Sequence, residues 1–195
     1  MSGVALIVDN GSLSIGALTR AVIAGGWVPR VVRHTRLGPL DADVAAVILS
    51  GTDVPASSPV YADELELIRG CRVPLIGICG GMHLIGRVYG EGIVDCTPTV
   101  GRWTVALDLA EPLFAGLTNP TVLFERHRFR LGEVPAGFAR IAWSAGCAVE
   151  AIRHLERPQF GIQAHPEFRA AGRRILANFL DLASGSGRSA SGDRP

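Results

Sequence analysis

The sequence has little charge and no long apolar run, and both absences exclude classes of protein. Charged residues make up 19% of the 195 residues and the net charge is +1, so the basic surface that binds nucleic acid is missing. No apolar run is as long as a membrane span, and residues 1–9 lack the basic start of a signal peptide. We therefore expect a cytoplasmic protein that binds neither nucleic acid nor membranes.

Cysteine is also scarce, and its spacing argues against a zinc site. The four cysteines stand far apart, with no pair at the spacing of about two to four residues that is typical of zinc ligands. In a reducing compartment they remain free thiols. We expect no metal and no cofactor, and we interpret three of the four as packing residues: Cys71, Cys96 and Cys147.

The length and the apolar content indicate one domain with a full core. Hydrophobic residues make up 48% of the chain, and 195 residues is an ordinary length for a single domain. We assign this domain to residues 1–183. Residues 184–195 are rich in Ser and Gly and have nothing to bury, so we expect them to form a disordered tail.

The alternation of short β-rich runs with helical patterns predicts an α/β fold. In the first half it predicts a mostly parallel central sheet with helices on both faces. In the second half, extended runs split by Pro, Gly and Asn predict antiparallel strands that extend the sheet. The predicted strands are Val4–Val8, Val28–Arg33, Ala45–Leu49, Val73–Ile78, Trp103–Leu107, Thr121–Glu125, Phe138–Trp143, Ala148–Arg153 and Phe160–Ala164. The predicted helices are Ser12–Gly25, Val60–Arg69 and a last one from Phe168 to Leu182.

Cys79 stands between an apolar run and an amphipathic run, with glycines on both sides. Gly77 and Gly81 allow a strand to turn sharply into a helix at this cysteine, as in a nucleophile elbow. The dipole at a helix N-terminus stabilises the reactive thiolate form of a thiol. Cys79 is therefore a candidate nucleophile, although a lone cysteine between glycines is more often a packing residue.

Two other strand ends carry the residues that a cysteine nucleophile needs. In sheets of this class the active cleft lies at the carboxyl ends of the strands. His165 follows one strand and is a candidate base, with Glu167 to orient it. Gly51 follows another strand, and its N–H together with that of Gly80 is suited to hold an oxyanion. Each motif alone can be explained as a turn or a helix start, but their conjunction favours catalysis.

With these motifs the chain resembles the class I glutamine amidotransferases over about residues 3–183, and among branches it is most similar to the separate amidotransferase subunit of GMP synthetases. The resemblance implies the flavodoxin-like fold of that family. It also implies that Cys79, His165 and Glu167 form a triad that hydrolyses the side-chain amide of glutamine through a γ-glutamyl thioester, with Gly51 and Gly80 as oxyanion donors. The matched stretches are Leu6–Asn10, Ile48–Gly51, Pro74–Met82, His127, Val149–Arg153 and Gly161–Glu167.

The sequence departs from the family pattern where glutamine is expected to bind. His83 replaces the family's usual glutamine, and it stands one helical turn after the nucleophile, where its side chain can still face the cleft. Thr52 replaces a glycine beside the oxyanion loop. Arg126 and Arg128 flank His127, and a guanidinium group is suited to bind a carboxylate. These five residues are our candidate substrate-binding residues; a packing histidine and a solvated loop are the alternatives.

Three functions remain open at this point. The first is a glutaminase subunit that supplies ammonia to a separate synthetase subunit, or that works as a homo-oligomer. The second is a stand-alone hydrolase of another γ-glutamyl amide or of a related small amide. The third is a non-catalytic regulatory subunit, against which the intact triad argues. We favour the first because the similarity is broad and the departures can be compensated. No nucleotide-binding region is visible after Leu182, so under this first function the ammonia is expected to be used by another polypeptide.

Overall fold

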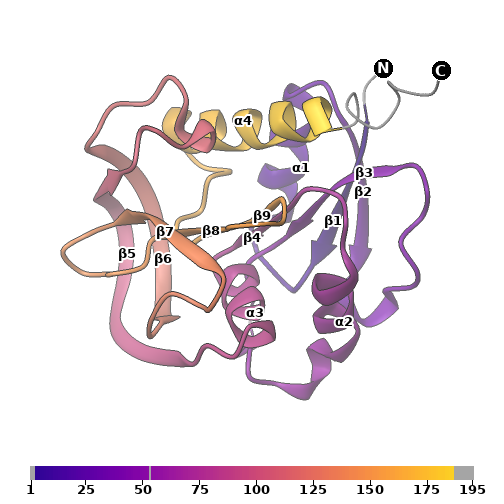
Figure 1. Ribbon diagram of the computed structural model, residues 1–195, viewed down its shortest axis with the longest axis horizontal. Coiled ribbons are helices and arrows are strands. Elements are labelled where there is room, and N and C mark those ends of the chain that lie inside the picture. The colour runs from indigo at the N-terminus through magenta and orange to yellow at the C-terminus, as the bar shows by residue number, and fades with distance from the viewer. Residues whose placement is uncertain (1–2, 53, 187–195) are drawn as a thin grey trace.

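A computed structural model describes residues 3–52 and 54–186, which form three layers with one mixed sheet between two layers of helices (Figure 1). Over these residues the sheet has nine strands in the order β2-β1-β3-β4-β9-β8-β7-β5-β6. The strands are β1 (Val4–Asp9), β2 (Val28–Arg33), β3 (Val44–Leu49), β4 (Leu75–Ile78), β5 (Ile93–Leu107), β6 (Thr121–Leu131), β7 (Phe138–Trp143), β8 (Ala151–His154) and β9 (Gln159–Ile162). The predicted α/β architecture is confirmed.

Helices cover both faces of the sheet, as predicted. Figure 1 shows α1 and α4 on one face and α2 and α3 on the other. The α-helices are α1 (Ile15–Ala24), α2 (Ala62–Gly70), α3 (Gly80–Val88) and α4 (Ala170–Ser186), and the short 3-10 turns are His34–Arg36, Pro59–Tyr61 and Pro112–Phe114. None of the helices within residues 3–52 and 54–186 is long and apolar enough to cross a membrane.

The last helix begins later than the sequence pattern predicted, at Ala170 rather than Phe168. Arg169 has a φ of 63°, in the left-handed region that a helix cannot continue through, so the preceding residues form a turn. At its other end α4 extends to Ser186. Three residues of the predicted tail thus belong to the helix, and the rest, 187–195, lie outside the described residues.

The parallel half of the sheet is completed by a strand from the far end of the sequence. β1, β2, β3 and β4 pair in parallel, and β9 then adds to β4 in parallel, with Ile78 opposite Ile162. The sequence pattern grouped this last strand with the antiparallel ones, but only its pairing with β8 is antiparallel. Because β4 and β9 end side by side, the residues that follow them meet at one edge of the sheet.

The two longest strands form an arm that the sequence pattern did not predict at full length. β5 starts at Ile93 and β6 runs on to Leu131, and the two pair antiparallel along most of their length. Their register shifts between Asp95 and Thr99, around Pro98, which cannot donate a backbone hydrogen bond. Side chains such as Val100 are exposed on this arm, so the burial pattern that reveals a core strand is weak there.

Successive side chains of a strand point to opposite faces of the sheet, so each face has its own apolar core. Ala5 and Ile7 of β1 are buried with residues of α1 and α4, whereas Leu6 and Val8 are buried with residues of α2 and α3. Both layers of helices are therefore held by apolar contacts with the sheet. Of the predicted packing thiols, Cys71 and Cys147 are buried in the core and Cys96 is half-buried.

Candidate active site

Cys79 forms a sharp turn between β4 and α3. Its φ of 49° and ψ of −108° are unusual for a residue with a side chain, a strain of about 1–3 kcal/mol. The Cys79 N–H donates to the Ile162 carbonyl at 2.7 Å, which ties the turn to β9. A Cβ atom on Gly77 would lie 2.5 Å from the Gly81 carbonyl, so only glycine fits at this crossing. The local sequence thus forms the elbow that its glycines predicted.

His165 and Glu167 lie directly after β9, beside the elbow. Nδ1 of His165 is 2.9 Å from Oε1 of Glu167, and both side chains are buried. The hydroxyl of Ser14, at the start of α1, donates to the same carboxylate oxygen. The His165 N–H donates to the Phe124 carbonyl at 2.8 Å, so β6 also fixes the position of this histidine.

The charges around His165 favour its protonated form. Burial by itself lowers the pKa of the imidazole, but its contacts with the Cys79 sulfur and the Glu167 carboxylate outweigh burial and raise the pKa to about 10. At neutral pH the His165 imidazole therefore carries a proton on each ring nitrogen. An imidazolium beside the sulfur stabilises a thiolate, which is the nucleophilic form of cysteine.

The two predicted oxyanion glycines flank the cysteine. A Cβ atom on Gly51 would lie 3.2 Å from Cε1 of His165 and 3.8 Å from Cβ of Cys79, so the loop after β3 passes against both side chains. A Cβ atom on Gly80 would overlap Thr52. The Gly80 N–H belongs to the first turn of α3, where backbone N–H groups have no partner within the helix.

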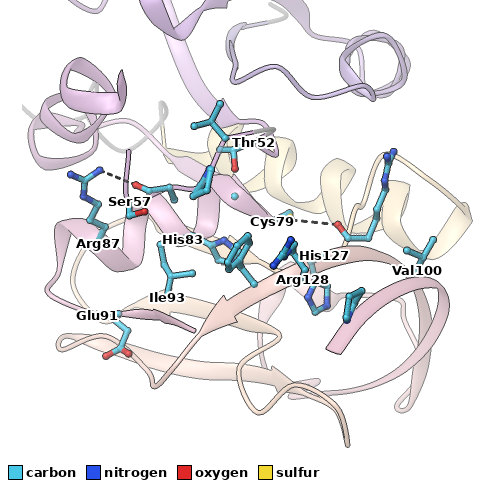
Figure 2. A pocket seen from close by; sticks show the side chains of 18 residues that line it. Thr52, Ser57, Cys79, His83, Arg87, Glu91, Ile93, Val100, His127 and Arg128 are labelled. Atoms are coloured by element: carbon cyan, nitrogen blue, oxygen red, sulfur yellow. Dashed lines mark hydrogen bonds between the residues drawn. The ribbon is translucent and has the colours of Figure 1, made fainter. Parts of the chain in front are cut away.

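A cavity of about 580 Å³ opens beside Cys79 (Figure 2). The five candidate substrate-binding residues line it, together with Cys79 and Gly80, whereas the triad partners His165 and Glu167 do not. It extends to Arg87, in the last turn of α3, and to Glu91, just after that helix. The wall is formed by residues from the loop after β3, from α3 and from the β5–β6 arm: Thr52, Val54, Pro55, Ala56, Ser57, Cys79, Gly80, His83, Arg87, Glu91, Gly92, Ile93, Pro98, Val100, Arg126, His127, Arg128 and Phe129.

His83 is not a free group in this cavity, because it is paired with a glutamine that sequence reasoning missed. Its Nε2 atom lies 2.9 Å from Oε1 of Gln163, and Nε2 of Gln163 lies 3.6 Å from Sγ of Cys79. Burial, with the nearby His127, lowers the pKa of His83 to about 4, so the imidazole is neutral at pH 7. Gln163 stands two residues before His165 at a strand end, a spacing that puts side chains on the same side.

The two arginines reach the cavity rim from exposed positions on β6. The carbonyl of Arg126 lies 3.8 Å from Sγ of Cys79, so the backbone of Arg126 is next to the nucleophile. Arg128 donates to Asp95 at 3.4 Å and lies over the ring of Phe129. The guanidinium group of Arg128 is therefore held by Asp95 and Phe129 on the rim of the cavity.

Buried acids lie behind the cavity, and no pattern in the sequence pointed to them. Nε2 of His127 is 3.4 Å from Oε2 of Glu125, and its Nδ1 is 3.5 Å from Sγ of Cys96. The nearby Glu150 is also buried, and its carboxylate accepts a hydrogen bond from the Ser144 hydroxyl at 2.6 Å. Burial, together with the charge of Glu150, raises the pKa of Glu125.

Comparison with protein families identifies the class of this site. The model of the class-I glutamine amidotransferases matches residues 6–182. A glutamine-hydrolysing subunit of the GMP synthase of Methanopyrus kandleri is 34% identical over 184 residues, covering 91% of this chain and 97% of that protein. An aminodeoxychorismate synthase of Streptomyces griseus is 30% identical over 197 residues, and this chain spans only 27% of its length.

Solved structures share the fold. A GMP synthase subunit from Thermoplasma acidophilum has a TM-score of 0.91 at 24% identity, with 98% of this chain and 99% of that chain covered. A glutamine amidotransferase from Thermotoga maritima has a TM-score of 0.78 at 16% identity, with 99% and 87% covered. The predicted fold class, down to its family, is confirmed.

Proposed function

The chain belongs to the class-I glutamine amidotransferase family, and we propose that it hydrolyses the side-chain amide of glutamine through a γ-glutamyl thioester on Cys79. The observation that carries this proposal is the strained turn at Cys79 beside the His165–Glu167 pair. A reactive thiol, a protonated imidazole and an orienting carboxylate are the groups that amide cleavage by cysteine needs.

In the proposed first half-reaction the Cys79 thiolate attacks the amide carbon of glutamine. The C–N bond breaks, and His165 gives its proton to the leaving nitrogen, which departs as ammonia. In the second half-reaction His165 takes a proton from water, which attacks the thioester and releases glutamate and the free thiolate. Glu167 keeps Nδ1 of His165 occupied throughout, so that the other ring nitrogen exchanges the proton.

The oxyanion of each tetrahedral intermediate is assigned to the N–H groups of Gly51 and Gly80. Both glycines contact the residues around the nucleophile, and the N–H of Gly80 belongs to the positive end of the α3 dipole. Donors fixed in this way stabilise charge that develops only during the reaction.

We further propose that a separate synthetase subunit receives the ammonia. The support is the similarity to the GMP synthase subunit of Methanopyrus kandleri, which the chain matches over 97% of the relative's length. The aminodeoxychorismate synthase carries much additional sequence beyond the shared region, so its amidotransferase part is one portion of a larger protein.

The test is release of glutamate and ammonia from glutamine by the purified chain, alone and with a co-encoded synthetase. We expect turnover that Cys79→Ala and His165→Ala abolish. Cys96→Ala is the matched control. The Cys96 sulfur also lies near a histidine, 3.5 Å from Nδ1 of His127, but we expect turnover not to depend on it. Turnover that survives both triad substitutions would refute the proposed mechanism.

The length of the cavity favours a second candidate, a stand-alone hydrolase of a larger γ-glutamyl amide. Cys79, His83 and Arg87 line the cavity at intervals of four residues, a span of about 12 Å along α3. In glutamine, the amide carbon is only about 4 Å from the α-carbon, since three C–C bonds separate them. The cavity is therefore longer than the glutamine side chain, and the remaining length leaves room for a substituent of a larger γ-glutamyl amide.

A panel of γ-glutamyl amides with substituents of increasing size separates the two candidates. Fast turnover of free glutamine that rises with the synthetase present supports the first. Clear turnover of a substituted amide, with none of glutamine under either condition, would instead establish the second.

A further inference from the structure

We propose that Gln163 is a positioning residue for the nucleophile and that His83 determines which end of the Gln163 amide faces Cys79. This inference rests on the proposed function, since it concerns how the sulfur is prepared for attack. In this proposal His83 orients the Gln163 amide rather than binding the substrate directly.

The geometry links the three side chains in a row. Gln163 is fully buried, and its Nε2 atom is within hydrogen-bonding distance of the large sulfur atom of Cys79, at 3.6 Å. Its Oε1 atom is 2.9 Å from Nε2 of His83. The N–H of Gln163 donates to the Glu150 carbonyl at 2.7 Å, so the backbone from which this side chain extends is held as well.

The direction of the Gln163 amide has a large electrostatic effect. With its NH₂ group toward Cys79, the amide donates a hydrogen bond to the sulfur and stabilises the thiolate. Rotated by half a turn, it would put its carbonyl oxygen against the sulfur, and two electron-rich atoms would face each other. Water is excluded from this buried position, so it does not moderate the difference.

His83 selects between these two directions. The imidazole is neutral, since burial lowers its pKa to about 4, and it therefore carries a single N–H. With the proton on Nε2 it donates to Oε1 of Gln163, which leaves the NH₂ group for Cys79. With the proton on Nδ1, Nε2 of His83 would be an acceptor, and the Gln163 amide would have to turn its NH₂ group toward His83 instead. Each tautomer matches one direction of the amide.

Figure 2 shows His83 between Cys79 and Arg87 on the wall of the cavity. The four-residue interval puts His83 one turn from Cys79 on the same face of α3. The side chain is only 4% exposed despite lining the cavity, so most of its surface contacts protein. Its partner Gln163 reaches Cys79 from the end of β9, on the other side of the turn.

The experiment measures alkylation of Cys79 by iodoacetamide as a function of pH, resolved by cysteine with mass spectrometry, in the full chain. We expect Gln163→Met to shift the midpoint of this profile to higher pH and to lower kcat by about 10- to 100-fold, the effect of losing a hydrogen bond to a charged group. KM for glutamine should change less than about threefold, because the contact is with the enzyme's own sulfur.

Further variants separate orientation from folding. Gln163→Glu keeps the volume and replaces the donor by an acceptor, so it should shift the profile in the same direction if Gln163→Met does not fold. Gln159→Met is the matched control. Gln159 is a fully buried glutamine on the same strand, but it bonds to Ile68 and Tyr89, so its loss should leave the alkylation profile in place.

His83 is tested by a pair of substitutions. His83→Leu removes the donor and should shift the alkylation profile as Gln163→Met does, whereas His83→Gln retains an N–H for Oε1 and should restore it. An unchanged profile in Gln163→Met or Gln163→Glu would overturn the proposal. So would a His83→Leu variant that raises KM with its kcat and profile unaltered, because that is the behaviour of a substrate clamp.

The readout does not depend on turnover. If the wild-type chain hydrolyses no glutamine but the alkylation profile still shifts with Gln163, the proposed function fails while this inference stands. If glutamine is hydrolysed and the profile does not shift, the inference fails alone.

Discussion

Nδ1 of His165 lies 2.9 Å from Oε1 of Glu167. This contact keeps the proton of a singly protonated imidazole on Nδ1, and it leaves Nε2 to exchange protons with the reacting groups. Glu167→Gln removes the carboxylate charge and allows the wrong tautomer. We expect kcat to fall by about 10²- to 10⁴-fold with a folded protein, measured as glutamate release at saturating glutamine.

Ser14→Ala is the matched variant for this prediction. Its hydroxyl donates to the same oxygen of Glu167 that lies next to Nδ1 of His165. Since it supports the carboxylate only indirectly, we expect a loss of no more than about tenfold. Equal losses in Glu167→Gln and Ser14→Ala would contradict a direct role for the carboxylate charge.

Gly77→Ala tests the elbow itself. The added Cβ atom would lie 2.5 Å from the carbonyl carbon and oxygen of Gly81, which are backbone atoms and cannot rotate away. We expect a loss of about 3 kcal/mol or more in the free energy of unfolding, measured by urea denaturation.

Gly70→Ala provides the control for that substitution. Gly70 ends α2, and a Cβ atom there meets nothing within 4 Å. We expect a change within about 1 kcal/mol, in the stabilising direction, because alanine restricts the unfolded chain. A Gly77→Ala variant as stable as Gly70→Ala would show that the turn can relax.

The sequence predicted those parts of the site that depend on local geometry. The tight strand-to-helix turn at Cys79 needs glycine at positions 77 and 81, where a Cβ atom would overlap backbone atoms, so the elbow could be predicted from the local sequence. His165 and Glu167 stand two residues apart, and their contact needs little more than the end of one strand. Features of the site that depend on local conformational restriction can therefore be predicted from the sequence.

Contacts between distant strands could not be predicted in the same way. Gln163 meets His83 because β9 pairs in parallel with β4, a register that no local pattern specifies. Glu125 meets Glu150 through the pairing of several strands, and buried acids are contrary to the usual tendency of charged residues to be exposed. The full length of the β5–β6 arm also depends on this mutual pairing.

The burial of His83 predicts a specific dependence of stability on pH. Its pKa is lowered from 6.5 to about 4 in the folded chain, so the unfolded chain binds the additional proton between these values. Stability contributed by the neutral imidazole is present above pH 6.5 and is lost as pH falls toward 4. We expect the stability difference between wild type and His83→Gln to change by up to about 3 kcal/mol across this range.

Urea denaturation of both proteins at several pH values between 4 and 7 measures this difference. The other histidines are common to both proteins and cancel. A new hydrogen bond made by the glutamine would add a constant, so the slope with pH, and not the offset, is the diagnostic quantity. A difference that does not vary with pH would mean that His83 is hydrated and titrates normally.

Glu125 predicts the opposite trend at higher pH. Burial and the neighbouring Glu150 raise its pKa above the ordinary value of 4.5, so the folded chain keeps a proton that the unfolded chain releases. Stability contributed by the protonated acid is fully present below about pH 4.5 and declines as pH rises through the raised value. Glu125→Gln keeps the shape and has no proton to lose. We therefore expect this variant to gain about 1–3 kcal/mol relative to wild type between pH 5 and pH 8.

The same denaturation experiment measures this effect, with Glu133→Gln as the control. Glu133 is an exposed acid just after β6, and its substitution should change stability by less than about 0.5 kcal/mol. A relative stability of Glu125→Gln that stays constant or falls with rising pH would show that Glu125 is ionised in the folded protein. In that case Glu150, whose pKa burial also raises, would be the protonated acid, and Glu150→Gln would show the rising trend instead.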